Sequence, residues 1–358
     1  MANVIISKTY RLTAPGVIEE ENIKREVKDN WVVVRPTMVS ACQADLRYFN
    51  GKRRQEALNA KLPMALFHEG VGVVIKSNSV DFLEGDRVII VPNIPGYVLA
   101  PEKYNGEEGV PDNYVIGTEF LGSGYDGIGQ SDLVHPAECL VKIPDEVSDK
   151  AAVLSEMSTI PYFALSHVSE KIKDKNTKIA VFGDGPVGYL TSLIITFMFD
   201  KDSEQFTVFG ADRDRLSNFT FVDTKMVQDY NIKNSKEKFD IIIEATGGEF
   251  SSSAINQAIE IIKPLGDLIL LGVSEDLVPI NTRDILEKGI RLYGSSRSST
   301  SDFEAVVKEM KNLNFQESLL KLLPEKEFDI YNSEDLVEAL KFITNNTKWE
   351  KSIIKFHF

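Results

Sequence analysis

Apolar and polar positions divide the chain into two parts with different patterns. Residues 1–150 carry short apolar runs broken by Gly and Pro, such as WVVVRPTMVS (31–40) and GVGVVIKS (70–77). Runs of this length bounded by turn residues predict β-strands. From about Lys178, strand-length apolar runs alternate with helix-length segments. These runs are TKIAVFGDG (177–185), EQFTVFGAD (204–212), FDIIIEATGG (239–248) and GDLILLGVS (266–274). The alternation predicts an α/β fold with a doubly wound parallel sheet.

A dinucleotide fingerprint follows the first of these runs. The segment Gly183-Asp184-Gly185-Pro186-Val187-Gly188 has the spacing G-x-G-x-x-G and precedes an apolar helix-like stretch. In this motif the first Gly permits a tight turn, the second lets the backbone approach a pyrophosphate, and the third lets helix and strand pack closely. The amino end of the helix then faces the phosphate charge. We therefore expect this segment to bind a nicotinamide dinucleotide.

The residues alone leave the choice between NAD and NADP open. The second run ends in Gly210-Ala211-Asp212-Arg213-Asp214-Arg215. If the strand ends at Gly210, its tip lacks an acid, and Arg213 or Arg215 can bind the 2′-phosphate of NADP. If the strand ends at Asp212, that carboxylate can bind the ribose 2′-hydroxyl of NAD. Thr246 and Gly272, near the ends of the later runs, are further expected cofactor contacts.

Three potential metal ligands lie upstream of the fingerprint. They are Cys42, His68 and Glu156. A thiolate, an imidazole and a carboxylate suit a tetrahedral zinc ion whose fourth position is open to water or substrate. Asp45 is expected to orient the metal-bound histidine. The chain has two cysteines in all, which excludes a disulfide framework and a four-cysteine zinc site.

With these motifs in place, the chain resembles the zinc-dependent medium-chain dehydrogenase/reductase superfamily. The resemblance rests on Cys42-x-x-Asp45, His68-Glu69-Gly70-x-Gly72, Gly85-Asp86-Arg87-Val88, the Glu156 segment, the fingerprint, and the closing run Lys351–Phe356. It implies a Rossmann domain over 151–296 and a GroES-like catalytic domain over 1–150 that is completed by 297–358. It also implies one catalytic zinc on Cys42, His68 and Glu156, with Glu69 behind the metal and Lys351 at the cofactor pyrophosphate.

Within this superfamily the chain is similar to the ribulose-5-phosphate reductases of CDP-ribitol synthesis. The similar segments are LPMALFHEGVGVV (62–74), VIIVPNIP (88–95), SAINQAIEIIKPLG (253–266) and the run from 270 to 299. This resemblance implies NADPH-dependent reduction of D-ribulose 5-phosphate to D-ribitol 5-phosphate, supplying teichoic acid or capsule synthesis. It further implies a homodimer joined through the Rossmann sheets, with 271–280 as the expected edge, and an association with a cytidylyltransferase.

Two departures from the superfamily pattern affect the chemistry. The excursion over 92–129 lacks the four closely spaced cysteines of the structural-zinc lobe, so we expect no second metal. The position two residues after Cys42 is Ala44, where many alcohol dehydrogenases have a Ser or Thr that relays a proton. Metal-bound water, Glu69 or a substrate hydroxyl remain as alternative proton routes.

Basic residues after Cys42 suit a phosphorylated substrate. The segment contains Arg47, Lys52, Arg53, Arg54 and Lys61, and Arg binds phosphate in a two-pronged fashion. Arg297, within GSSRSS, is a second basic candidate. We predict that Arg47, Arg53 or Arg297 binds the substrate phosphate, although a solvated basic loop would have the same composition.

Overall charge and hydropathy exclude other classes of protein. Lys and Arg number 40 against 54 Asp and Glu, a net charge of −14, which disfavours nucleic acid as a partner. The longest apolar stretch, 190–199, is about half as long as a membrane span, and the first residues lack the apolar core of a signal peptide. We therefore expect a cytoplasmic protein without membrane attachment. His135, His167 and His357 are expected to be structural or surface residues.

Two alternative functions stay open from the sequence. One is an NAD-dependent polyol dehydrogenase that oxidises an unphosphorylated sugar alcohol. The other is a dinucleotide-binding protein without catalysis, which would bind cofactor but neither zinc nor a ketose.

Overall fold

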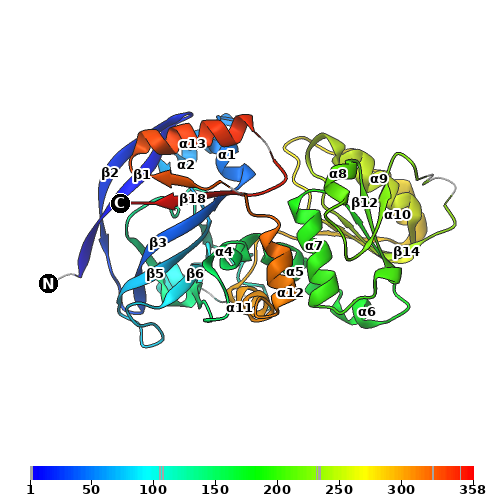
Figure 1. The fold of residues 1–358 in the computed structure, drawn as a ribbon, viewed down its shortest axis with the longest axis horizontal. Coiled ribbons are helices and arrows are strands. Elements are labelled where there is room, and N and C mark those ends of the chain that lie inside the picture. Colours follow the sequence, from blue (N-terminus) through cyan, green and yellow to red (C-terminus); the bar gives the residue numbers. More distant parts are fainter. Residues whose placement is uncertain are drawn as a thin grey trace. The chain divides into compact units, whose positions relative to one another are not determined.

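The chain forms two compact units. The computed structural model describes residues 3–104, 106, 109–230, 232, 235–324, 326–346 and 348–358. One unit comprises Met1–Glu156 with Arg297–Phe358, and the other comprises Met157–Ser296 (Figure 1). The first boundary lies six residues beyond position 150, inside helix α5 (Ser155–Ser166), because that helix continues from one unit into the other.

Both ends of the chain contribute strands to the main sheet of the first unit. The strand order is β10-β6-β5-β3-β18-β17, and β9 also pairs with β3. The bounds are β3 Trp31–Ala41, β5 Glu69–Ser77, β6 Arg87–Ile90, β9 Leu133–Pro136, β10 Leu140–Lys142, β17 Phe328–Ile330 and β18 Ser352–Phe356. Strand β3 lies in the interior of the sheet, and its residues are almost all buried. This explains why its sequence is a continuous apolar run rather than an alternating one.

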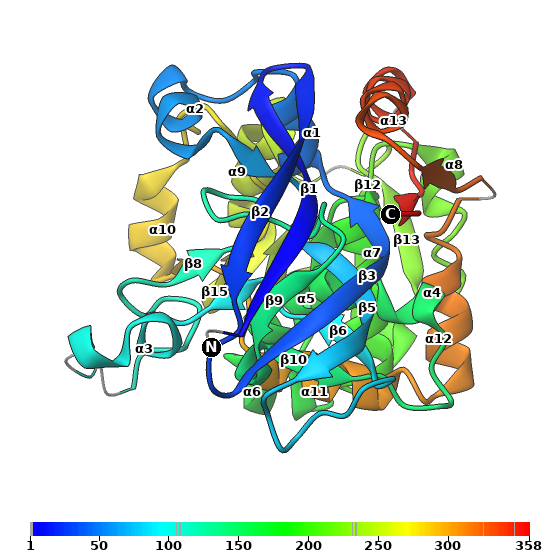
Figure 2. The same cartoon turned by 90° about the vertical axis from the view of Figure 1, so that its left-hand side faces the viewer.

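Smaller elements complete the first unit. A long hairpin of β1 (Val4–Ala14) and β2 (Val17–Glu26) pairs with β4 (Met64–Ala65) and stands in front of the main sheet of this unit in Figure 2. A short sheet joins β7 (Asn93–Ile94) to β8 (Glu119–Phe120). The helices are α1 Gln43–Phe49, α2 Gln55–Lys61, α3 Gly96–Leu99, α4 Asp149–Ala152, α11 Thr300–Glu309, α12 Leu313–Leu320 and α13 Ser333–Asn345.

The second unit is a parallel sheet between helices. Its strand order is β13-β12-β11-β14-β15-β16, the order of a Rossmann fold. The strands are β11 Ile179–Phe182, β12 Phe206–Gly210, β13 Asp223–Met226, β14 Phe239–Glu244, β15 Ile262–Leu270 and β16 Arg291–Gly294. The helices are α6 Ser169–Lys173, α7 Pro186–Phe197, α8 Arg213–Leu216, α9 Ser251–Ile261 and α10 Thr282–Lys288. The predicted doubly wound sheet is confirmed.

A buried core explains these strand sequences. On one side of the sheet, Ala258 and Ile259 of α9 pack with Phe182, Phe239 and Ile242 of the strands. Because such strands are covered on both faces, they read as continuous apolar runs. The segment 271–280, which was expected at the edge between two copies, contains no strand within this chain, and β16 pairs with Asp267–Leu270 of β15. Its place between two copies remains a prediction.

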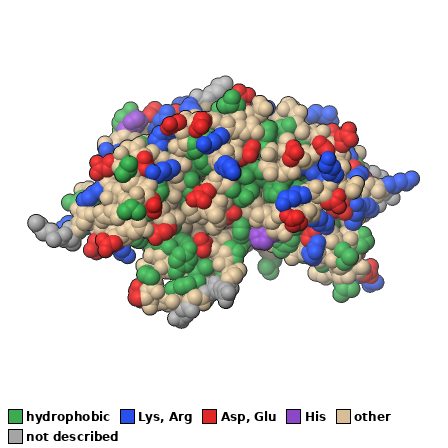
Figure 3. Space-filling model, turned by 90° about the horizontal axis from the view of Figure 1, so that it is seen from below, with side chains coloured by type: hydrophobic (Ala, Val, Ile, Leu, Met, Phe, Trp, Pro, Cys, Tyr) green, Lys and Arg blue, Asp and Glu red, His purple; other side chains and the backbone are tan. Residues whose placement is uncertain are grey.

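The surface agrees with the mixed-charge composition. Figure 3 shows acidic and basic side chains interspersed over one face. Among the described residues, no helix combines the length and apolarity needed to span a bilayer.

Candidate catalytic and cofactor sites

The register of one sheet brings distant residues to a common edge. Strand β3 is antiparallel to both β5 and β18, with Ser40 opposite Glu69 and Ala41 opposite Ser352. The carboxyl end of β3 therefore meets the beginnings of the other two strands. Cys42 follows β3, Glu69 begins β5, and Lys351 precedes β18.

Cys42, His68 and Glu69 form a compact group of potential metal ligands. Their ligand atoms all lie within 4.8 Å of one another. His68 and Glu69 are buried, and Cys42 is half-buried. A thiolate, an imidazole and a carboxylate are the donor types that zinc takes in catalytic sites, so the group fits the metal expected from the sequence.

Asp45 connects the ligand segments to each other. Its Oδ2 accepts a hydrogen bond from the Cys42 amide at 2.9 Å, and its Oδ1 accepts one from the Phe67 amide at 3.0 Å. The same Oδ1 lies 3.6 Å from His68 Nδ1. Burial opposes a charge on His68, but the interactions with Asp45, and after them those with Cys42, outweigh it and raise the pKa of His68 well above its usual value. Asp45 thus lies where a group that orients the imidazole is needed.

A buried ion pair lies beside this group. Lys351 Nζ lies 2.9 Å from Glu69 Oε1 and 2.8 Å from Oε2. Burial disfavours the ammonium, but attraction first to Glu69 and then to Cys42 raises the pKa of Lys351 above its usual value. The side chain expected at the cofactor pyrophosphate therefore balances the charge of Glu69; its contact with cofactor remains a prediction.

Glu156 lies near the group but outside its tight cluster. It is the second residue of α5 and is buried. Burial raises the pKa of its carboxyl to about 7, and the charges of His68 and Glu69 act on it in opposite directions. The carboxyl is thus within electrostatic reach of both side chains.

The three predicted phosphate-binding arginines lie in different surroundings. The Arg297 guanidinium carbon lies 4.7 Å from the centre of the Phe120 ring, and that ring lies 5.4 Å from the His68 ring. The guanidinium carbon of Arg53 lies 4.8 Å from the centre of the Tyr48 ring. Arg47 is in the last turn of α1 and is half-buried. Phe120 and Tyr48 were not predicted from the sequence, because no motif indicates a ring that packs on a functional side chain.

The glycine fingerprint forms the turn between β11 and α7. A Cβ on Gly188 would lie 2.0 Å from the Gly183 carbonyl oxygen, so only glycine fits there. A Cβ on Gly185 would meet no atom within 4 Å, which leaves open space where a ligand would approach the backbone. Pro186 and Val187 form the first turn of α7.

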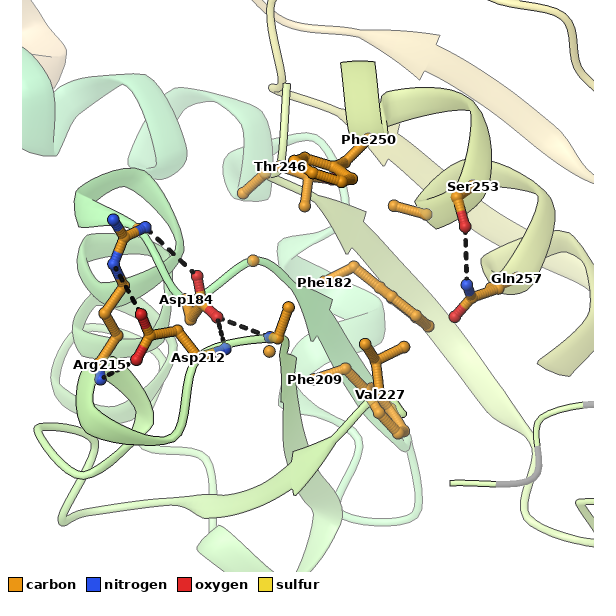
Figure 4. A pocket seen from close by; sticks show the side chains of 16 residues that line it. Phe182, Asp184, Phe209, Asp212, Arg215, Val227, Thr246, Phe250, Ser253 and Gln257 are labelled. Carbon is orange, nitrogen blue, oxygen red and sulfur yellow. Dashed lines mark hydrogen bonds and ion pairs between the residues drawn. The ribbon is translucent and has the colours of Figure 1, made fainter. Parts of the chain in front are cut away.

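A cavity opens beside this turn within the second unit. It encloses about 370 Å³, in the range of small-molecule sites. Figure 4 shows its side chains, which come from β11 and the fingerprint turn, from β12 through α8, from the residue after β13, and from the segment after β14 through α9. Among the expected cofactor contacts, Gly183, Gly185, Arg215 and Thr246 line it.

Strand β12 ends at Gly210 and not at Asp212. This is the strand end for which Arg213 or Arg215 was expected to bind the 2′-phosphate of NADP. Asp212 instead caps helix α8, accepting hydrogen bonds from the amides of Asp214 and Arg215. An acid from the fingerprint lies beside the end of β12. Asp184 Oδ2 accepts hydrogen bonds from the amides of Ala211 and Asp212 at 2.6 and 2.8 Å. Its Oδ1 lies 3.8 Å from Arg215 (Figure 4). Because this contact joins two separate turns, local patterns did not reveal it.

Thr246 and Gly272 are both organised by the buried Glu244. Its Oε1 accepts hydrogen bonds from the Thr246 amide at 2.9 Å, from the Thr246 hydroxyl, and from the Gly247 amide at 3.0 Å. A Cβ on Gly272 would lie 2.6 Å from the Glu244 carboxylate oxygens. Glu244 is a further residue that the sequence analysis did not identify.

Comparison with known proteins identifies the family of this chain. The alcohol dehydrogenase GroES-like domain matches residues 28–145, and the zinc-binding dehydrogenase domain matches 209–312. Ribulose-5-phosphate reductase 1 of Staphylococcus aureus is 36% identical over 98% of this chain and 99% of its own length. The ribulose-5-phosphate reductase of Bacillus spizizenii is also 36% identical, with the same coverage.

A solved structure extends the likeness to the whole fold. S. aureus TarJ in complex with NADPH superposes with a TM-score of 0.83 at 32% identity, covering 99% of this chain and 100% of that one. The expected combination of a Rossmann domain and a GroES-like domain is confirmed. The chain therefore belongs to the zinc-binding alcohol dehydrogenase family, together with the ribulose-5-phosphate reductases.

Proposed function

We propose that the chain reduces D-ribulose 5-phosphate to D-ribitol 5-phosphate with NADPH at a single zinc site, as a step toward teichoic acid or capsule synthesis. The observation that carries this proposal is the convergence of Cys42, His68 and two carboxylates at one edge of the main sheet. The names of the full-length relatives support the choice of substrate.

Cys42, His68 and Glu156 are the proposed metal ligands. Glu69 is closer to the first two in the structure, but Lys351 contacts both of its carboxylate oxygens. Since this ion pair already balances the charge of Glu69, we assign Glu69 to the position behind the metal. Glu156 is assigned as the third ligand. The Asp45 carboxylate, which lies beside His68 Nδ1, orients the imidazole ring. A zinc ion held by these residues would supply Lewis-acid chemistry, which polarises a ketone oxygen and stabilises negative charge on it.

The second unit is proposed to bind NADPH. The pyrophosphate would lie on the Gly183–Gly188 turn at the amino end of α7, and the cavity beside it would hold the adenosine part. The last residue of β12 is Gly210 rather than an acid, although the Asp184 carboxylate lies beside this end of the strand. Arg213 and Arg215 are therefore assigned to the 2′-phosphate. The NADPH complex of the S. aureus protein supports the same choice.

A panel of substrates and cofactors tests this proposal on zinc-loaded protein. Absorbance at 340 nm is followed with ribulose 5-phosphate or ribulose, and with NADPH or NADH. We expect fast oxidation of NADPH only with the phosphorylated ketose. Equal rates with ribulose would favour the polyol dehydrogenase alternative. Cofactor binding without turnover on any ketose would favour a non-catalytic dinucleotide-binding protein.

We further propose a homodimer and an association with the cytidylyltransferase that uses the product. In the described part of the chain β16 is paired only with β15, which is compatible with sheet extension by a second copy. A cytoplasmic location belongs to the same proposal, because NADPH and sugar phosphates are intracellular metabolites. Light scattering after gel filtration tests the dimer, and co-elution with the purified cytidylyltransferase tests the association.

A further inference from the structure

Cationic and hydroxyl side chains gather around Tyr48 in the first unit. Besides Arg53, Lys61 lies over the Tyr48 ring, with its Nζ 5.7 Å from the ring centre. Lys61 Nζ donates a hydrogen bond to Ser123 Oγ at 2.8 Å, and this oxygen is 3.5 Å from Tyr48 Oη. We call Tyr48, Arg53, Lys61 and Ser123 the Tyr48 cluster. It combines two positive charges with two hydroxyls.

The two cations of the cluster are less exposed than the basic residues Lys52 and Arg54. Lys52 and Arg54 are exposed, whereas Arg53 between them is half-buried against the buried Tyr48 ring. Lys61 is also half-buried, and within the described part of the chain it contacts a hydroxyl and a ring but no carboxylate. Partial burial of an ammonium group costs free energy unless an anion compensates it. A purely solvated position therefore does not explain Lys61.

The cluster favours negative charge at its centre. Burial opposes ionisation of Tyr48, but hydrogen bonding with Ser123 and Lys61, together with the charges of Lys61 and Arg53, lowers the pKa of its phenol below the usual value. An anion placed among these groups would experience the same stabilisation.

Two connections place the cluster next to the catalytic group. Tyr48 is six residues after Cys42 along α1, about 9 Å at the helical rise of 1.5 Å per residue. Ser123 follows Gly122, and a Cβ on Gly122 would lie only 3.2 Å from the amide nitrogen of Phe67, the residue before His68. In a pentulose 5-phosphate, five bonds of about 1.5 Å separate the carbonyl carbon from phosphorus, a span of roughly 6 Å. The rise of α1 between Cys42 and Tyr48 is of the same order as this span.

We infer that the Tyr48 cluster binds the phosphate group of the substrate, with Arg53 and Lys61 supplying the charge and the hydroxyls of Tyr48 and Ser123 donating hydrogen bonds. This inference rests on the proposed function, which makes the substrate a sugar phosphate. Of the arginines expected from the sequence, it selects Arg53. Arg297, over the ring that packs on His68, is closer to the reacting end of the substrate.

The test compares substitutions within the cluster with a matched control. Arg53→Gln and Lys61→Gln remove one charge each, and Lys52→Gln removes an exposed neighbouring charge. We expect kcat/KM for ribulose 5-phosphate to fall roughly 10- to 100-fold in each cluster variant, mainly through KM. The values for unphosphorylated ribulose, and both values for Lys52→Gln, should stay near wild type. Lys61→Arg should recover most of the loss because it restores the charge.

Inorganic phosphate provides a second readout that does not need turnover of the ketose. Calorimetric titration of zinc-loaded wild type with phosphate should show binding that Arg53→Gln and Lys61→Gln weaken at least tenfold. If wild type does not reduce ribulose 5-phosphate, the proposed function fails, and this titration still decides whether the cluster binds phosphate.

Other results would overturn the inference while leaving the proposed function intact. Equal losses with phosphorylated and unphosphorylated ketose would assign the cluster a structural role. Loss of phosphate discrimination in Arg297→Gln, with Arg53→Gln and Lys61→Gln unaffected, would move the phosphate to Arg297. Thermal melting of every variant separates these effects from misfolding, and the two cations lie in different segments, so one unstable variant leaves the other informative.

Discussion

The Lys351 ammonium group contacts both carboxylate oxygens of Glu69, at 2.8 and 2.9 Å, and both side chains are buried. These residues are 282 positions apart in the chain, and the pairing of β3 with β5 and β18 brings them together. The ion pair thus couples the C-terminal strand to the candidate metal group.

Replacing Lys351 with Met should leave the buried Glu69 carboxylate unpaired. We expect a loss of about 3–5 kcal/mol in the free energy of unfolding, the usual cost of removing one partner of a buried ion pair. The double variant Lys351→Met/Glu69→Gln should recover much of this loss. Urea denaturation measures both. Lys173→Met, which breaks the exposed pair with Glu170, is the control and should show little change; a similar loss there would contradict the argument.

The purified protein should contain about one zinc ion per chain, because one set of ligands is proposed. Cys42→Ser should retain much less zinc and lose most reductase activity, since the hydroxyl is a far poorer ligand than a thiolate. Metal analysis and the 340 nm assay give the two values. About two zinc ions per chain would indicate a second site, and full activity in the zinc-free variant would refute the metal assignment.

Arg215→Ala should reduce the preference for NADPH. We expect kcat/KM for NADPH to fall roughly 10- to 100-fold while the value for NADH changes little, because only NADPH carries the 2′-phosphate that the guanidinium would bind. Arg283→Ala, an exposed change on α10 of the same unit, serves as the control. A parallel loss with both cofactors would show that Arg215 acts on the fold rather than on the phosphate.

Asp184→Asn should increase the preference for NADPH over NADH, the opposite of the effect expected for Arg215→Ala. The amide oxygen can still accept hydrogen bonds from the Ala211 and Asp212 amides, but the negative charge near the proposed 2′-phosphate is removed. KM for NADPH should therefore decrease several-fold relative to KM for NADH. Steady-state kinetics with each cofactor gives this ratio, and an unchanged ratio would place Asp184 away from the 2′-phosphate.

His135 should make the protein sensitive to acid. Its Nε2 is 2.8 Å from the Val91 carbonyl oxygen, and complete burial lowers the pKa of the imidazole to about 4. In the unfolded chain the pKa is about 6.5, so the unfolded state binds the proton first as pH falls. Stability should therefore decline from pH 6.5 toward 4, by up to roughly 3 kcal/mol.

His135→Gln does not titrate but can still donate to the Val91 carbonyl. Urea denaturation of both proteins at pH 7 and at pH 4.5 isolates the contribution of the imidazole. We expect a smaller loss of stability in the variant over this interval. Identical losses in the two proteins would show that other groups cause the acid sensitivity.

The elements that depend on local pattern could be predicted from the sequence. Continuous apolar runs indicated the strands of the parallel sheet, because strands covered on both faces need apolar residues throughout. The fingerprint was recognisable because Gly183 and Gly188 meet a steric requirement within one turn. The order of Cys42, His68 and Glu156 before this turn indicated the family, which the comparisons confirm.

Contacts between distant segments required the tertiary structure. Strand register depends on both of the paired strands; it places Lys351 against Glu69, and it makes β16 the last strand of the parallel sheet within this chain. The same holds for Asp184 beneath the end of β12 and for Lys61 against Tyr48. Periodicity along the chain thus determined which residues are buried, and glycine spacing indicated the turn that is proposed to bind cofactor. Backbone pairing between strands decided which charged groups meet, because that choice depends on hydrogen bonds between residues far apart in sequence.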